Sequence, residues 1–302
     1  MSTGISGAVL KRSGLYLLGV VLLLAAVQPA SPFSPSSQVV SAKACFVMDD
    51  KDSVLYARNP SAKLPPASTV KLVTAMVALD RLSPEALVTV SRTAAATRSI
   101  KPRLKADEEL TVSDLLHLAL MKSINGAAVA LAEEAAGSED AFVELMNRKA
   151  EEIGACDTHF ITASGLPKGK QYTTARDLAI IMKRALTYPL IKEVLGKKEW
   201  LVITPAGREL YLENSDDMLW YRSNMLGGKT GFTNSAQHCF VGAMDTEKGI
   251  IYTAVLGAVS RFRLWESTQT LAELGTNPDL EISFQEPPVR KYRHRARRMK
   301  KI

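Results

Sequence analysis

One group of residues in this sequence has the types and spacing needed for nucleophilic catalysis by a serine. The group is Pro66-Ala67-Ser68-Thr69-Val70-Lys71. If Ser68 opens the helix that the following apolar residues predict, Lys71 lies one turn further along on the same face. A serine hydroxyl needs a neighbouring base, and a lysine can serve when burial and nearby positive charge lower its pKa. Ser68 is therefore predicted as the nucleophile and Lys71 as its base.

Two further groups supply what such a pair would need. Ser123-Ile124-Asn125 falls in the turn between two predicted helices, where Ser123 could relay a proton and Asn125 could bind a substrate amide. The segment Gly228-Lys229-Thr230-Gly231-Phe232-Thr233 offers a charge and a hydroxyl for a terminal carboxylate. Its Gly231 would let a substrate backbone lie close to a strand edge.

Each group has a simpler interpretation when it is taken alone. The first could be an N-cap serine with a surface lysine, the second a helix cap, and the third a glycine-rich hairpin turn. Their occurrence together and in this order is what indicates chemistry, because this set of motifs is typical of penicillin-binding proteins and class A β-lactamases.

The elements that must position these groups follow from hydrophobic patterning. Apolar segments flank Asp49-Asp50-Lys51-Asp52 and predict a hairpin, and a second strand pair is predicted at Cys239–Met244 and Ile251–Val259. Helical spacing and capping residues predict helices in between. These run over Lys71–Leu82, Thr111–Met121 (with Thr111 as N-cap and Asp114 three residues on), Ala127–Ala136, Phe142–Ile153 and Leu178–Ala185.

Strands at both ends with helices between them predict an α+β fold, in which N- and C-terminal strands form one antiparallel sheet and the helices form an insertion. The predicted organisation is a signal peptide (1–30), a Ser/Pro linker (31–40), a single catalytic domain (41–280) and a basic, disordered tail (281–302). At 302 residues, 46% hydrophobic and 23% charged, the chain is long enough for such a core.

The two ends of the chain indicate an exported protein. Lys11 and Arg12 precede the apolar run Gly14–Val27, which fits a signal peptide and is shorter than the ~20 residues that span a bilayer. An uncleaved anchor stays open as an alternative. The run Arg290–Lys301 carries eight Lys or Arg and no acid, so it accounts for all of the net charge of +7 and the rest of the chain is at −1. In an exported protein, this run favours anionic lipid or wall polymer as a partner over nucleic acid, unless it is solvated with no partner.

No metal or cofactor is predicted. The three cysteines form no Cys-x-x-Cys pair, and the four histidines lack metal-ligand spacing. Cys45 and Cys239 lie in apolar, strand-like runs and are predicted as buried hydrophobic residues, although the sequence leaves their pairing open.

With these motifs, the sequence resembles the D-alanyl-D-alanine carboxypeptidases, which are the low-molecular-mass penicillin-binding proteins. The likeness covers roughly residues 40–275. Besides the three motifs it includes the stretches LPPASTVKLVTAMVAL, TVSDLLHLALMKSINGAAVALAE, FVELMNRKAEEIGACDTHFITASGL, YTTARDLA and GGKTGFTNSAQHC. The resemblance implies the transpeptidase-like fold and a periplasmic or cell-envelope enzyme that acts on peptidoglycan stem peptides and is acylated by β-lactams.

The resemblance also implies a role for each residue. Ser68 would be acylated by the penultimate D-Ala, with Lys71 as base, while Ser123 and Asn125 line the cleft. Lys229 and Thr230 would hold the substrate carboxylate, and Arg263 would add positive charge. The backbone N–H groups of Ser68 and Phe232 would form the oxyanion hole. Phe232 stands where the family commonly has His, which leaves its backbone role unaffected.

The expected reaction is removal of the terminal D-Ala from stem pentapeptides, without a cofactor. The nearest alternative is a D,D-endopeptidase that cuts crosslinks with the same site. A β-lactamase is disfavoured because the chain has no Glu-x-x-Leu-Asn segment to activate the deacylating water. An inactive wall-binding protein is disfavoured because every expected catalytic side chain is present.

Overall fold

The computed structural model describes residues 40–276, which hold all three motifs. The predicted signal peptide, nearly all of the linker and the basic tail lie outside the described residues. The strands are β1 Ala44–Asp49, β2 Val54–Arg58, β3 Leu87–Thr89, β4 Glu109–Thr111, β5 Glu199–Ile203, β6 Glu209–Glu213, β7 Met225–Thr233, β8 Gln237–Thr246 and β9 Gly249–Ala258. The helices are the 3-10 turn η1 Ala67–Val70, then α1 Lys71–Leu79, α2 Arg92–Ala96, α3 Val112–Leu120, α4 Asn125–Ala136, α5 Glu139–Glu152, α6 Ala175–Ala185, α7 Pro189–Gly196, α8 Met218–Tyr221 and α9 Arg261–Thr276.

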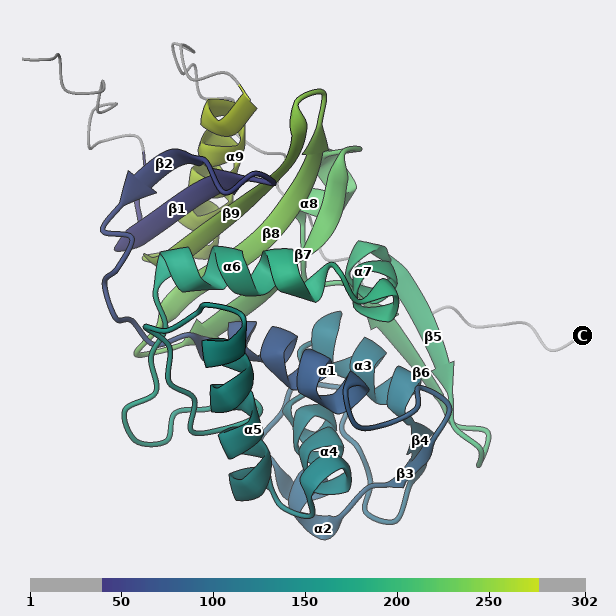
Figure 1. Cartoon of the computed structure of the whole chain (residues 1–302). Helices are drawn as coiled ribbons and strands as arrows, with labels where there is room; N and C mark the ends of the chain where they lie inside the picture. The colour runs from purple at the N-terminus through teal and green to yellow at the C-terminus, as the bar shows by residue number, and fades with distance from the viewer. Residues whose placement is uncertain (1–39, 277–302) are drawn as a thin grey trace, which may run out of the picture. The chain divides into compact units, whose positions relative to one another are not determined.

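Strands from both ends of the described chain form one five-stranded antiparallel sheet in the order β2-β1-β9-β8-β7 (Figure 1). β1 pairs with β9 with Val47 opposite Thr253, so the N-terminal hairpin is joined directly to the C-terminal strands. The predicted fold class is confirmed, and the third motif lies on β7, a strand at the edge of the sheet rather than a hairpin turn.

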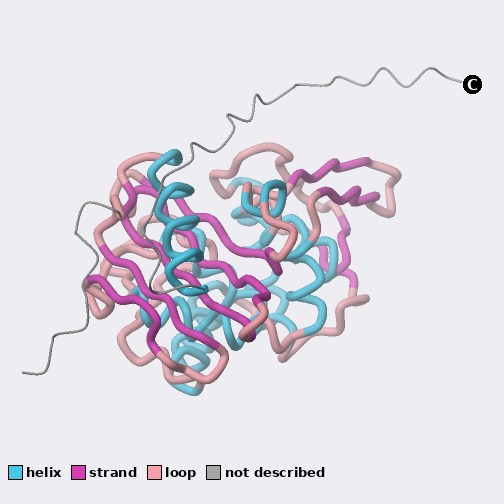
Figure 2. The backbone as a smooth tube through the Cα atoms, turned by 90° about the horizontal axis from the view of Figure 1, so that it is seen from above, coloured by secondary structure: helices cyan, strands magenta, loops and turns pink. Residues whose placement is uncertain are grey.

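Both faces of the sheet are covered, α6 lying across one face and α9 across the other (Figures 1 and 2). Residues along β1 therefore alternate between two hydrophobic clusters. Phe46 and Met48 join the larger cluster on the α6 side, while Cys45 and Val47 join the cluster on the α9 side. This is why the whole strand is apolar instead of alternating between polar and apolar residues.

The helical insertion packs around α1, whose residues Lys71 to Ala78 are all buried. Its neighbours begin and end at capping residues. Thr111 and Asp114 form a reciprocal capping box at the start of α3, as predicted. Gly137, with a φ of 76°, ends α4 in the left-handed conformation that glycine adopts without strain. Ser138 then caps α5, which begins at Glu139, three residues earlier than predicted.

Two small two-stranded sheets, β3–β4 and β5–β6, were not predicted. In β5, Val202 is buried and pairs with Leu210 of β6, but Leu201 and Ile203 on the opposite face are apolar and exposed. The alternation of polar and apolar residues that marks a strand is therefore missing from this segment. Among the described residues, no helix is long and apolar enough to span a bilayer.

Candidate active site

Ser68 and Lys71 lie at the junction of η1 and α1, on the side facing the edge of the sheet. The Nζ atom of Lys71 lies 2.9 Å from Ser68 Oγ, and the Lys71 side chain is fully buried. The alternative of a surface lysine is therefore wrong. Ala67, just before the serine, has a φ of 49°, an uncommon value for a residue other than glycine. Its carbonyl is held against Gly165, where an added Cβ would lie 1.9 Å from that oxygen.

The partners of Lys71 indicate which protonation state suits catalysis. Besides Ser68, its Nζ donates to Asn125 Oδ1 at 2.7 Å and to the carbonyl of Ser164 at 2.5 Å. These two oxygens can only accept, so a neutral amine would use both of its N–H groups on them. The lone pair of that amine would then point to the Ser68 hydroxyl, which can donate.

Burial lowers the pKa of Lys71 well below its usual range, and the positive charge of Lys229 lowers it further. Both causes disfavour the ammonium form. The site therefore favours a neutral lysine that can accept a proton, as a general base for a serine requires.

Asn125, from the second motif, is held between two segments of the chain. As the first residue of α4 it donates through Nδ2 to the carbonyl of Arg98 at 2.7 Å, while its backbone N–H donates to Ser99 Oγ at 2.9 Å. The bond to Arg98 fixes the orientation of the amide and leaves Oδ1 to accept from Lys71. Ser123 lies in the turn before α4 in the left-handed region, with a φ of 61°.

The third motif brings a second buried lysine to the same place. Lys229 of β7 donates from Nζ to Ser123 Oγ at 3.1 Å and to the carbonyl of Thr230 at 2.8 Å. Burial lowers the pKa of Lys229 to about 7, although the carboxylate of Asp216 opposes that shift. The hydroxyl of Thr230 lies 2.7 Å from that of Ser215. Ser123 thus joins the second motif to the third, as Asn125 joins it to the first.

Gly231 is where β7 touches the nucleophile. A Cβ added there would lie 2.9 Å from Ser68 N and 3.0 Å from Ala67 Cβ. The two segments expected to carry the oxyanion-hole N–H groups, at Ser68 and Phe232, therefore lie in contact. The Phe232 side chain is 53% exposed and packs on His238 of β8 with ring centroids 4.5 Å apart.

Arg263, the arginine predicted for the site, makes no described contact with the residues of the three motifs. Arg263 pairs with Glu266 on its own helix. Arg261, two residues earlier, instead donates to Asp217 Oδ2 at 2.9 Å and to the carbonyl of Ser215 at 3.2 Å. Since Ser215 contacts Thr230, Arg261 is linked to the third motif. Arg261, Ser164, Ser215 and Asp216 are all absent from the sequence-based prediction of the site.

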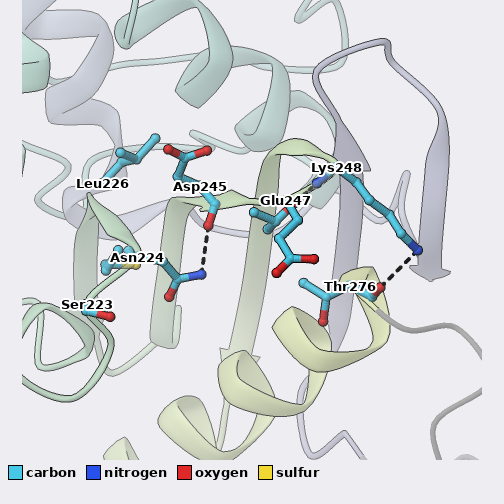
Figure 3. A pocket seen from close by; sticks show the side chains of 9 residues that line it. Ser223, Asn224, Leu226, Asp245, Glu247, Lys248 and Thr276 are labelled. Carbon is cyan, nitrogen blue, oxygen red and sulfur yellow. Dashed lines mark hydrogen bonds between the residues drawn. The ribbon is translucent and has the colours of Figure 1, made fainter.

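A cleft of about 580 Å³ lies beside the motifs, with Asn125 and Phe232 in its wall. Another, of about 610 Å³, lies at the opposite end of β7, near the β8–β9 turn and the end of α9 (Figure 3). There Asn224 bonds the carbonyl of Asp245, and Lys248 bonds the carbonyl of Thr276. Because the motif residues do not line this second cleft, the site is identified by its chemistry and not by its volume. Within residues 40–276, no group of His, Cys, Asp and Glu could hold a metal ion.

A buried lysine beside a serine at the edge of an antiparallel sheet defines the class of serine acyl-transfer enzymes with a lysine base. Known proteins agree with this class. A sequence model of the family described as D-alanyl-D-alanine carboxypeptidase matches residues 31–260. The D-alanyl-D-alanine endopeptidase of Pseudomonas aeruginosa is 32% identical over 81% of this chain and 80% of its own length.

A sequence relative and a solved structure from Mycobacterium tuberculosis extend the comparison. The carboxypeptidase DacB2 is 33% identical over 78% of this chain and 84% of its own length. The crystal structure of a D-alanyl-D-alanine carboxypeptidase matches with a TM-score of 0.76 and 31% identity, covering 84% of this chain and 97% of that one. The chain belongs to the D-alanyl-D-alanine carboxypeptidase family, which confirms the resemblance and the fold expected from it.

Proposed function

We propose that this protein is a serine-type D-Ala-D-Ala carboxypeptidase that removes the terminal D-Ala from peptidoglycan stem pentapeptides. The observation that carries the proposal is the contact between Lys71 Nζ and Ser68 Oγ, with the other two Lys71 partners being pure acceptors. The family to which the chain belongs supports the same reaction.

In the proposed reaction, Ser68 Oγ attacks the carbonyl carbon of the penultimate D-Ala while Lys71 takes the hydroxyl proton. The C–N bond then breaks, the proton passes to the leaving amine, and terminal D-Ala departs. The ester left on Ser68 is hydrolysed by water, which returns the serine. Proton transfer of this kind contributes about 10²–10⁴-fold to a rate, and no cofactor takes part.

Charged and polar groups near β7 would hold the two ends of the reacting bond. Lys229 and Thr230 are assigned to the substrate carboxylate, and Lys229 donates to Ser123 Oγ of the second motif. The N–H groups of Ser68 and Phe232 are assigned to the oxyanion, where each donor is worth about 3 kcal/mol. Arg263 stays a prediction in carboxylate binding, since its guanidinium pairs with Glu266, and Arg261 is the better supported candidate.

β-Lactams should acylate Ser68 by the same attack, since their strained amide takes the place of the scissile bond. We further infer that the protein is exported to the periplasm or cell envelope, where its substrate lies. The basic run Arg290–Lys301 is proposed to contact anionic lipid or wall polymer.

A second candidate reaction is cleavage of peptidoglycan crosslinks by the same site. It is favoured by one observation, namely that the Pseudomonas relative named as an endopeptidase aligns with 81% of this chain. The leaving group is free D-Ala in a pentapeptide and a second stem peptide in a crosslink. Substrate profiling therefore separates the two reactions.

The test compares purified protein on a pentapeptide monomer and on a crosslinked dimer, following D-Ala release and dimer loss by liquid chromatography. Carboxypeptidase activity predicts D-Ala release from the monomer, abolished by Ser68→Ala. Cleavage of the dimer alone would contradict the carboxypeptidase and support the endopeptidase. Loss of neither substrate would contradict both.

A further inference from the structure

The cleft of about 580 Å³ beside the motifs is built from three separate segments. The loop after α2 contributes Arg98 and Ile100, the loop after residue 164 contributes Leu166, and the end of β7 contributes Phe232. Asn125 also lines it, and its amide connects the cleft to both Lys71 Nζ and the carbonyl of Arg98. Whatever occupies the cleft therefore lies next to the reacting bond.

The direction of the bound peptide follows from the order of residues along β7, if the proposed function holds. The terminal carboxylate is assigned to Lys229 and Thr230, while Phe232 and Thr233, further along the strand, line the cleft. A peptide extended along this edge, with its scissile carbonyl at Ser68, must run its upstream residues toward the cleft. The cleft would thus receive the part of the substrate that remains as the acyl group.

The lining of the cleft combines four apolar side chains with polar ones and a single positive charge. Ile100 and Phe232 are 57% and 53% exposed, which is unusual for large apolar side chains and suits them to cover a ligand. Arg98 is the one charged residue among those described in the lining. Its carbonyl is bound by Asn125, but its guanidinium makes no hydrogen bond or ion pair among the interactions described for residues 40–276. A free guanidinium presents parallel N–H donors that can bind both oxygens of a carboxylate.

We propose that Arg98 binds a carboxylate in the upstream part of the stem peptide, while Ile100 and Phe232 pack on the aliphatic portion that carries it. The substrate class is accordingly an anionic peptide ending in D-Ala-D-Ala, with at least one free carboxylate upstream of the scissile bond. This inference rests on the proposed function and adds selectivity for the acyl side to it.

The experiment uses two synthetic stem pentapeptides that end in D-Ala-D-Ala. One carries free carboxylates on a γ-linked D-Glu and on the side chain of a diaminopimelate at the third residue, and the other carries both groups as carboxamides. D-Ala release gives kcat/KM for each peptide. We expect the wild type to prefer the carboxylate peptide by about twofold to fivefold, the upper range of an exposed ion pair.

Arg98→Gln is expected to bring the ratio of the two kcat/KM values close to one, and Arg98→Lys to give an intermediate ratio. Arg92→Gln is the matched control, because it removes an equal charge from an exposed arginine on α2 that does not line the cleft. It should keep the wild-type ratio. The ratio cancels any general damage to catalysis, which would slow both peptides alike.

Equal rates for the two peptides with the wild type would overturn the role of Arg98 and leave the proposed function standing. So would an equal fall of the ratio in Arg92→Gln and Arg98→Gln, since that pattern reflects net charge alone. If the wild type releases D-Ala from neither peptide, the proposed function fails and the inference fails with it. Should Arg98→Gln be insoluble, Arg98→Lys and the wild-type comparison still decide.

Discussion

At the scale of single residues, the site depends on two buried lysines that affect each other. Lys229 lowers the pKa of Lys71, while Asp216 keeps the pKa of Lys229 from falling further. Asp216 is itself fully buried, and burial raises its pKa to about 7. The proposed reaction needs a neutral Lys71 and a protonated Lys229, so acylation should rise with pH as Lys71 loses its proton and fall as Lys229 loses its own.

Removing the Asp216 carboxylate should narrow this pH profile. In Asp216→Asn the negative charge that favours protonated Lys229 is gone, so the pKa of Lys229 falls. The alkaline limb of the acylation rate should move to lower pH. The measurement is the second-order rate of acylation by a fluorescent penicillin between about pH 5 and pH 9.

Asp245→Asn is the control, because Asp245 is an exposed acid in the cleft at the far end of β7. It should leave the alkaline limb in place. If the alkaline limb of the acylation rate stays in place in Asp216→Asn, or moves to higher pH, then the Asp216 charge does not favour protonated Lys229 and this explanation is wrong.

At the scale of elements, the site is a meeting of the start of α1, the start of α4 and the edge strand β7. β7 can pack closely against η1 because Gly231 has no side chain. A Cβ at this position would meet the backbone N of Ser68 and the Cβ of Ala67. This packing aligns the strand with the nucleophile, so activity depends on it more than stability does.

Gly231→Ala should therefore impair acylation more than a comparable glycine substitution elsewhere. The new Cβ would lie 2.9 Å from Ser68 N, and a displacement of about 1 Å at a reacting group can cost about 10²-fold in rate. Overpacking should also lower stability by about 1–3 kcal/mol. Acylation rate and thermal midpoint would both be measured.

Gly137→Ala provides the comparison. Nothing lies within 4 Å of its added Cβ, but its positive φ makes alanine unfavourable by about 1–2 kcal/mol. It should lose stability and keep its acylation rate. The packing account fails if Gly231→Ala is acylated as fast as Gly137→Ala.

Elements with local signals could be predicted from the sequence, and those whose signals are tertiary could not. The capping box at Thr111 and the end of α4 at Ala136 have local signals, and both were predicted correctly. The β5–β6 hairpin was missed because Leu201 and Ile203 remove the alternation of a surface strand.

The same distinction applies to the site. The three motifs could be found because their side chains are chemically distinctive. The carbonyls of Ser164 and Arg98, which orient Lys71 and Asn125, could not be, since every residue carries a carbonyl. Arg263 was predicted to add positive charge, but residues two apart on a helix point in nearly opposite directions, and Arg261 is the one linked to the third motif. Only the folded start of α9 shows which of the two contacts Ser215.

At the scale of the whole molecule, the catalytic groups come from parts of the chain that meet only after folding. Ser68 follows the N-terminal hairpin, Asn125 belongs to the helical insertion, and Lys229 lies on a C-terminal strand. The sheet that joins the two ends of the described chain is covered on both faces, so the cysteines on its strands are shielded from solvent. Cys45 and Cys239 are buried and unpaired, whereas Cys156 is exposed.

A thiol-reactive reagent such as dithionitrobenzoate should therefore count one fast thiol in the native protein and three after denaturation. Burial raises the pKa of both Cys45 and Cys239 to about 12, which disfavours the reactive thiolate as well as blocking access. Cys156→Ser should abolish the fast reaction. Two or more fast thiols in the native protein would contradict the packing of the sheet.

The most direct test of the central claim, that Lys71 activates Ser68 for acylation, is to locate the acyl group. Purified protein would be incubated with penicillin, digested, and mapped by mass spectrometry. The account predicts one penicilloyl group per chain, carried by the peptide that contains Ser68. It also predicts no modification of Ser68→Ala, and at least 10²-fold slower modification of Lys71→Arg, which cannot accept the proton. A penicilloyl group on another residue, or undiminished labelling of Ser68→Ala, would contradict it.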